Sequence, residues 1–317
     1  MKNKYLFVTI LLIILLVLGV GLTNVYVACE DKDRDDNIEI VTSFYPMYIA
    51  ALNIVGDIED VQLTNLSEPQ TGCLHDYQLT PADMKLLSSA DIFVVNGGGI
   101  ESFLADVAEE YEGLAIVEAS RDIELLSGEG HVHSEAEHAQ DDEEVHAGEN
   151  AHAWMSVTDY MQQVQTITDG LCKADPEHAA AYQKNAGIYM EKLASLKEEA
   201  EGLKELLSGS PVVIFHEAYE YVADEYGMEV AYVMNLDEER QISAGEVADV
   251  LSAIKEHNVT VVLAEEQYGR KMGDTVERES SAKVYYIDPL VRGEYDADSY
   301  INAMRENIRI LKEAFAE

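Results

Sequence analysis

Short β-rich runs alternate with helical runs in two groups along this chain, and this alternation constrains the fold more than any other feature of the sequence. The first group is IEIVTSF, VQLTNL, DIFVVNG and LAIVEAS; the second is PVVIFH, MEVAYVM, VTVVLAEE and AKVYYID. Strands and helices in turn predict parallel sheets that are covered by helices on both faces. We therefore expect an α/β protein with two (β/α)4 lobes. One continuous sheet is the alternative.

The helical runs carry start signals at the places where this alternation needs them. Thr80, Pro81 and Asp83 supply a cap, a first-turn proline and an acid at the third position. Ser243 and Glu246 have capping-box spacing before an amphipathic run. Both segments are predicted to begin helices that separate strands.

One predicted helix is long enough to join two lobes. Asp175 and Pro176 are typical of a helix start, and no proline follows until Pro211. Roughly thirty residues at 1.5 Å each would span about 45 Å. We expect an N-terminal lobe at 38–174, a rigid linker helix at 175–209 and a C-terminal lobe at 210–317.

The N-terminus has the pattern of an export signal. Lys2 and Lys4 precede an apolar stretch from Tyr5 to Leu22, and an acidic segment follows. We interpret 1–28 as a signal peptide and 29–37 as an acidic tether. A single membrane-spanning anchor is the alternative, because eighteen apolar positions are near the length needed to cross a bilayer.

The charge of the chain favours cations as its ligands. Its 61 acidic and 21 basic residues leave a net charge of -40. Such a charge repels nucleic acid, so we expect no nucleic-acid partner, and it raises the local concentration of cations.

The segment 121–150 interrupts the strand–helix alternation with a polar, acidic loop. Within it, residues 131–146 contain four histidines among six carboxylates and have no apolar run to bury. These histidines are His131, His133, His138 and His146. We expect this accessory loop to bind cations weakly and to raise metal capture. A solvated insert without a measurable role is the alternative.

Four further side chains are predicted to form a metal site. Ligands of open parallel α/β sheets bind at the carboxyl ends of the strands, where these four residues stand. They are His75 in GCLHDYQLTP, His152 in ENAHAWMS, His216 in VVIFHEAY and Asp288 in VYYIDPL. We expect the four to converge between the lobes. Three imidazoles and a carboxylate can complete a tetrahedral zinc shell.

The chain resembles the zinc and manganese solute-binding proteins of bacterial ABC importers. The resemblance covers nearly the whole mature chain and rests on stretches that occur in the family's order. They are VTSFYPMY, HDYQLTPADMKLLSSADIFVVNGGGIE, NAHAWMS, DPEHAAAYQKNAGIYMEKL, FHEAYEYVADEYG, ISAGEVADVLSAIKEHNV and VYYIDPL. The resemblance implies two lobes joined by one long helix, with His75, His152 and His216 as metal ligands and Asp288 as the fourth.

The resemblance also favours zinc, Zn2+, as the transported ligand, with Mn2+ or another transition metal as the alternative. Manganese members commonly have a carboxylate at the position of His216, and zinc members often carry a His-rich acidic loop at the place of 121–150. Some zinc members leave the fourth position to water or to a glutamate slightly farther along the chain, which makes Glu294 the other candidate here.

The expected partners and location follow from the same resemblance. We expect delivery of metal to an ABC permease and its ATPase, by a monomer outside the cytoplasm. VYVAC resembles a lipobox, which implies a lipid anchor on Cys29 at the cell membrane, although Tyr26 stands where an aliphatic residue is usual. A secreted or periplasmic protein is the alternative. Cys73 and Cys172 could form a disulfide or remain thiols.

Two functions of other classes are alternatives to transport. Three histidines with an open fourth position also suit a zinc hydrolase. HEAYE at 216–220 lacks the second histidine of the metalloprotease motif, and the chain has no Gly-x-Ser-x-Gly elbow. We therefore expect no enzyme activity. The other alternative is a surface adhesin or metal buffer without a transport role.

Overall fold

Eight strands form two separate four-stranded sheets in the computed structural model, which describes residues 37–68, 77–128, 148–236 and 240–316. The first sheet contains β1 (Ile38–Thr42), β2 (Val61–Asn65), β3 (Ile92–Val95) and β4 (Ala115–Glu118), in the order β2-β1-β3-β4. The second contains β7 (Pro211–Ile214), β8 (Glu229–Val233), β9 (Val261–Ala264) and β10 (Lys283–Tyr286), in the order β10-β9-β7-β8. All eight strands lie within the runs that predicted them.

The two sheets repeat one strand order, and the strand pairs whose register is known are parallel. β1 pairs with β3, and β3 with β4; β7 pairs with β8 and β9, and β9 with β10. Every residue of β3 and of β9 is buried, as expected for central strands covered on both faces. The two α/β lobes are thus confirmed, and the alternative of one continuous sheet is wrong for the described residues.

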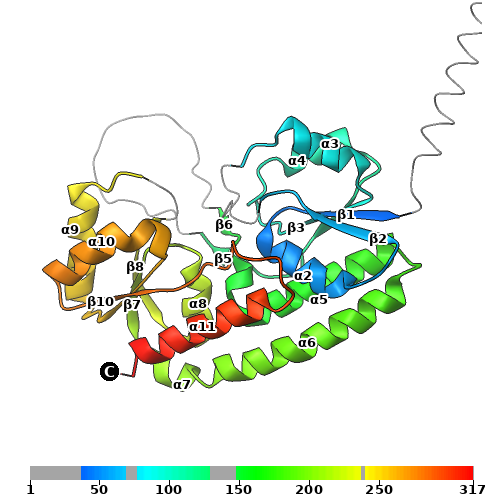
Figure 1. Cartoon of the computed structure of the whole chain (residues 1–317). Helices are drawn as coiled ribbons and strands as arrows, with labels where there is room; N and C mark the ends of the chain where they lie inside the picture. The colour runs from blue at the N-terminus through cyan, green and yellow to red at the C-terminus, as the bar shows by residue number, and fades with distance from the viewer. Residues whose placement is uncertain (1–36, 69–76, 129–147, 237–239, 317) are drawn as a thin grey trace, which may run out of the picture. The chain divides into compact units, whose positions relative to one another are not determined.

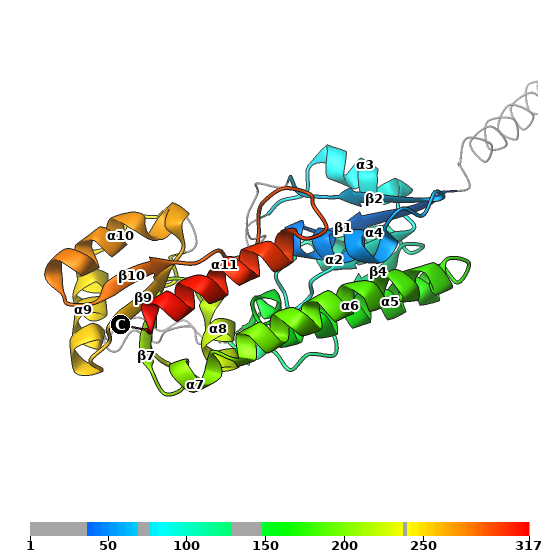
Figure 2. The same ribbon diagram turned by 60° about the horizontal axis from the view of Figure 1, so that its bottom comes forward.

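Helices cover the sheets, and the predicted caps form. The Thr80 and Asp83 side chains cap α3 (Pro81–Ser89) reciprocally, and Ser243 and Glu246 do the same for α9 (Ala244–Glu256). The remaining helices of the lobes are marked in Figures 1 and 2. They are α2 (Tyr45–Val55), α4 (Leu104–Glu110), α5 (Val157–Ala174), α8 (Tyr219–Tyr226), α10 (Glu266–Glu279) and α11 (Ser299–Ala314).

The long helix is α6 (Ala179–Glu201), which lies beside α5 and α11 in both views (Figures 1 and 2). The helix begins four residues after the predicted start at Asp175, because residues 176–178 form a turn. The Asp175 carboxylate accepts a hydrogen bond from Tyr182 Oη at 2.8 Å. They end at Glu201, and the short α7 (Lys204–Leu207) follows. None of the helices among the described residues is long and apolar enough to cross a membrane.

The predicted loop 121–150 is structured at both of its ends. β5 (Leu126–Ser127) pairs antiparallel with β6 (Glu149–Asn150), and Gly128 N donates to Gly148 O at 2.8 Å. A Cβ atom at position 128 would lie 2.5 Å from that carbonyl oxygen, so this close approach requires glycine. The interpretation of the whole range as a loop is therefore wrong at its stem. Polar composition did not reveal these two short strands.

Candidate metal site

The second sheet carries one imidazole and two carboxylates just after the carboxyl ends of its strands. His216 lies two residues after β7, Glu265 follows β9 directly, and Asp288 lies two residues after β10. The strand order reverses between β7 and β9, and ligands of open α/β sheets bind at such reversals. This sheet therefore offers a binding edge where the sequence predicted one.

His152 reaches the same neighbourhood by a different route from the one expected. It does not follow β4 directly; it comes after β6 and precedes the short 3-10 helix η1 (Ala153–Met155). Buried Trp154 fixes this helix to the C-terminal lobe. Its Nε1 donates to Pro289 O at 2.9 Å, and its carbonyl oxygen accepts from Tyr300 Oη at 2.9 Å. His152 is thus held between β6 on one side and the anchored Trp154 on the other.

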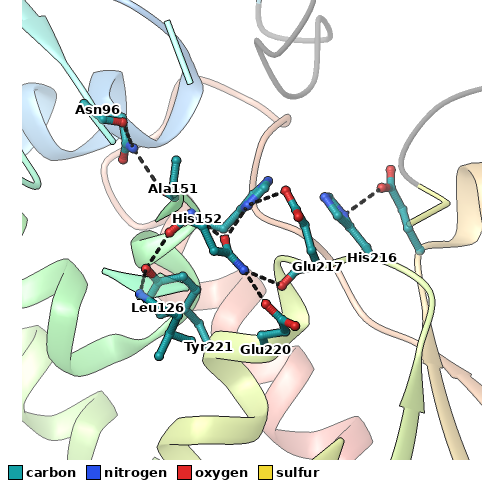
Figure 3. A network of polar contacts seen from close by, with 11 residues as sticks. Asn96, Leu126, Ala151, His152, His216, Glu217, Glu220 and Tyr221 are labelled. Carbon is teal, nitrogen blue, oxygen red and sulfur yellow. Dashed lines mark hydrogen bonds and ion pairs between the residues drawn. The ribbon is translucent and has the colours of Figure 1, made fainter. Parts of the chain in front are cut away.

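The imidazole rings of His152 and His216 lie edge to face inside the protein. Their centroids are 5.0 Å apart with an interplanar angle of 83°, and the residues are 0% and 1% exposed. One ring comes from the N-terminal half of the chain and the other from the C-terminal half. Figure 3 shows the two rings side by side, each with its own polar contacts.

Polar neighbours contact the Nδ1 atom of each ring. His152 Nδ1 lies 2.8 Å from Asn150 Oδ1 and 3.7 Å from Glu217 Oε1. His216 Nδ1 lies 3.7 Å from Glu265 Oε2, and the other oxygen of this buried carboxylate pairs with Arg292 at 2.9 Å. An outer partner at hydrogen-bond distance, as Asn150 is for His152, orients an imidazole that binds metal through the opposite nitrogen.

Asp288 lines a cavity of about 320 Å³ together with Glu265 and Arg292. Its main chain is held on both sides by Asn307, which accepts from Asp288 N and donates to Asp288 O, each at 2.8 Å. Desolvation by the surrounding protein raises the pKa of the Asp288 carboxyl, against the lowering effects of the Leu290 amide and the Arg292 charge. Within the described ranges, no group of three or more His, Cys, Asp or Glu side chains is arranged to hold a metal ion.

Several predicted residues lie outside the described residues. They are Cys29, Cys73, His75, His131, His133, His138 and His146. The structure therefore brings together two of the four predicted ligands, His152 and His216, and does not place Asp288 in a three-donor group with them. Cys172 is a free thiol that donates to Ala179 O at 3.5 Å.

The alternative ligand Glu294 has an exposed side chain, and its backbone is engaged by the other lobe. Tyr45 Oη donates to Glu294 O at 2.9 Å, and Ser299 Oγ donates to the same oxygen at 2.9 Å. Neither bond involves the Glu294 carboxylate. The main chain there is therefore part of a contact between α2 and the segment before α11.

The corresponding edge of the first sheet is built around a buried carboxylate. Glu101 accepts from Ser43 Oγ and Asn96 N, each at 2.7 Å, and from Gly97 N at 3.0 Å. Burial raises the pKa of this carboxyl, although the three bonds act in the opposite direction. Asn96 Nδ2 in turn donates to Ala151 O at 2.9 Å, next to His152. This cluster supports the chain beside the candidate site.

Comparisons with known proteins show the family of this chain. Residues 40–314 match the family described as zinc-uptake complex component A, periplasmic. The chain belongs to this family. It is 31% identical to the high-affinity zinc uptake system protein ZnuA of Bacillus subtilis (strain 168) over 290 residues, which cover 89% of this chain and 88% of that protein. It is 28% identical to the zinc-binding lipoprotein AdcA of Streptococcus pneumoniae (strain R6) over 90% of its own length, and spans 58% of that longer relative.

Solved structures share the fold. The solute-binding protein FpvC of Pseudomonas aeruginosa in complex with Ni2+ aligns with a TM-score of 0.74 and 26% identity, over 88% of this chain and 97% of that one. Zn(II)-bound AdcA of Streptococcus pneumoniae aligns with a TM-score of 0.72 and 26% identity, over 89% of this chain and 58% of that one. Members of this family are the substrate-binding components of transport systems, so the hydrolase alternative is not supported.

Proposed function

We propose that this protein is the extracytoplasmic solute-binding component of an ABC importer, which binds zinc and delivers it to a membrane permease and its ATPase. The observation that carries the proposal is the buried pair of His152 and His216, two imidazoles from different halves of the chain with centroids 5.0 Å apart. Membership of the zinc-uptake family supports the same function. Imidazole nitrogen is a donor well suited to zinc.

The proposed ligand set is His75, His152, His216 and Asp288. The strand-end position of Asp288, on the rim of a cavity that also contains Glu265, supports it over Glu294 as the fourth ligand. In this proposal the Asp288 carboxylate joins His152 and His216 when the metal binds, since these three do not form a donor group in the part of the chain that the structure describes.

Other divalent metals are the alternative cargo. An N-rich site binds nickel and copper strongly in solution, following the general order of divalent affinities. The FpvC structure with Ni2+ shows that a related fold accommodates such an ion. Zinc is favoured here because the family match and the relatives ZnuA and AdcA are named for zinc.

We also propose roles for two segments outside the core of the lobes, the N-terminal tether and the accessory loop. The acidic tether 29–37 would hold a monomer at the membrane through a lipid on Cys29. The histidines of the accessory loop would capture zinc weakly and raise its concentration near the tight site. The stem formed by β5 and β6 supports this idea, because it joins the loop to the chain two residues before His152.

Release would need only small movements of the lobes or loops. The long α6 packs along α5 and is tied to the C-terminal helix α11 by the Arg305–Glu199 pair at 2.9 Å. A stiff connector of this kind limits large hinge closure. Docking on the permease would therefore favour a conformation that binds zinc less tightly.

Metal titration of the chelator-stripped protein tests the function. We expect one tight zinc site and weaker additional binding, with zinc preferred over manganese in competition. Asp288→Asn removes the charge but keeps an oxygen that can coordinate, so it is expected to lower zinc affinity only about tenfold, roughly 1.4 kcal/mol, and Glu294→Gln should leave it unchanged. Tight binding that survives both His152→Ala and His216→Ala would contradict the proposed site.

A further inference from the structure

We propose that Asn150 is a positioning residue that holds His152 and His216 in a fixed relative position and selects the ring nitrogen that His152 presents to metal. This inference rests on the proposed function, because it assumes that both histidines bind the metal. Asn150 ends β6 and is 1% exposed.

Both ends of the Asn150 carboxamide are engaged. Its oxygen accepts the backbone N–H of His152 at 3.1 Å and lies 2.8 Å from His152 Nδ1. Its nitrogen donates to Glu217 O at 3.0 Å and to Glu220 Oε2 at 2.8 Å. One buried side chain therefore joins the His152 ring to the chain segment at the start of α8.

These contacts determine the tautomer of His152. A backbone carbonyl and a carboxylate only accept hydrogen bonds, so the amide nitrogen must face Glu217 O and Glu220. The amide oxygen must then face His152. Because this oxygen is an acceptor, Nδ1 carries the hydrogen and Nε2 keeps the lone pair that a metal ion requires.

The same amide connects the backbones that carry the two rings. Glu217 follows His216 directly, so the bond from Asn150 to Glu217 O links the His216 segment to β6. Tyr221 reinforces the link, because its Oη donates to Asn150 O at 2.6 Å and accepts from Leu126 N at 3.1 Å. Donors that are ordered before binding lose less conformational freedom when the metal binds.

Three variants separate the two roles of the amide. Asn150→Ala removes every side-chain contact and should lower zinc affinity about 10- to 100-fold, the usual cost of an outer partner. Asn150→Asp keeps an acceptor for His152 but sets a carboxylate against Glu217 O and Glu220, so affinity should also fall. Adding Glu220→Gln to Asn150→Asp restores a donor opposite the acceptor with the net charge of the wild type. This double variant should regain at least about tenfold in affinity over Asn150→Asp alone, as expected for directly coupled residues.

Nitrogen-15 NMR of the metal-free protein at one fixed pH gives a readout that a purely structural role would not move. The wild type, Asn150→Asp and the double variant should show His152 protonated at Nδ1. Asn150→Ala should show a mixture of both tautomers or the Nε2–H form. Asn185→Ala is the matched control, because it removes a half-buried amide that bonds to Ile54 O and Val55 O in α2. Its His152 tautomer and zinc affinity should equal those of the wild type.

The outcomes distinguish this inference from the proposed function. A wild-type protein that does not bind zinc, or that binds it equally well after His152→Ala, would overturn the function. If His152→Ala weakens binding while Asn150→Ala leaves affinity or the His152 tautomer unchanged, the positioning role is wrong. It is equally wrong if the double variant binds no better than Asn150→Asp.

Discussion

The two lobes repeat one strand order but use its binding edge differently. In the second sheet, His216 and Glu265 stand at the ends of the two strands where the order reverses, and Arg292 balances the buried carboxylate. In the first sheet, the corresponding ends of β1 and β3 meet around Glu101, whose contacts hold the chain together. The N-terminal half supplies its described imidazole from the stem of an insert. The repeated fold thus provides equivalent positions that carry different side chains.

The two edges differ in the partners of their buried carboxylates, Glu101 and Glu265. A carboxylate that accepts three hydrogen bonds from its own lobe is committed to structure, because losing any of them leaves a buried donor unsatisfied. The Glu265 carboxylate is shared between Arg292 and the His216 ring and so can respond to a cation there. We therefore expect substitutions of Glu265 to affect metal affinity and substitutions of Glu101 to affect stability.

The largest expected effect separates the candidate ligand from the accessory loop. His216→Ala should lower zinc affinity by more than about 100-fold, above the 10- to 100-fold cost of an outer partner, because a direct ligand is lost. His138→Ala should change it little. Competition against a chelator measures both constants. Equal losses in the two variants would place the tight site elsewhere.

Glu101→Ala tests the structural role of the first edge. It should lower the free energy of unfolding by about 2–3 kcal/mol, since three buried donors lose their acceptor while the cost of burying a charge is relieved. Urea unfolding of the metal-free protein measures this change. Glu109→Ala, at an exposed position of α4, is the control and should stay within about 0.5 kcal/mol of the wild type. A Glu101 variant as stable as this control would remove the contrast between the lobes.

Glu265→Gln tests whether the carboxylate at the edge of the second sheet contributes to metal affinity. The amide cannot form the ion pair with Arg292, and it removes the negative charge that lies 3.7 Å from His216 Nδ1, so zinc affinity should fall about tenfold, at the low end for an outer partner. Glu266→Gln is the neighbouring control, because its exposed carboxylate pairs with Arg270 and has no recorded contact with the His216 ring among the described residues. Isothermal titration of both variants suffices. A larger loss in the Glu266 variant would show that the structure assigns the wrong carboxylate to His216.

The smallest expected effect concerns the insert. Replacing residues 129–147 by a short Gly-Ser linker between Gly128 and Gly148 keeps β5 and β6, so the tight site should retain its affinity within about threefold, roughly 0.7 kcal/mol. The number of weak sites and uptake at scarce zinc should fall. If stoichiometry and uptake both stay the same, the capture role of the accessory loop is excluded.

The sequence by itself determined the eight strands, the capped helices and the strand-end position of His216, because periodicity, capping residues and buried β-rich runs act over a few neighbouring residues. It also singled out His152 without revealing how that residue is held. Only the tertiary structure decided that β5 and β6 pair, that Asn150 bridges His152 to the segment after His216, and that Glu265 faces the second ring. These contacts join residues far apart in the chain, and no local pattern encodes them, because they depend on how the two lobes pack and which buried polar groups must then find partners.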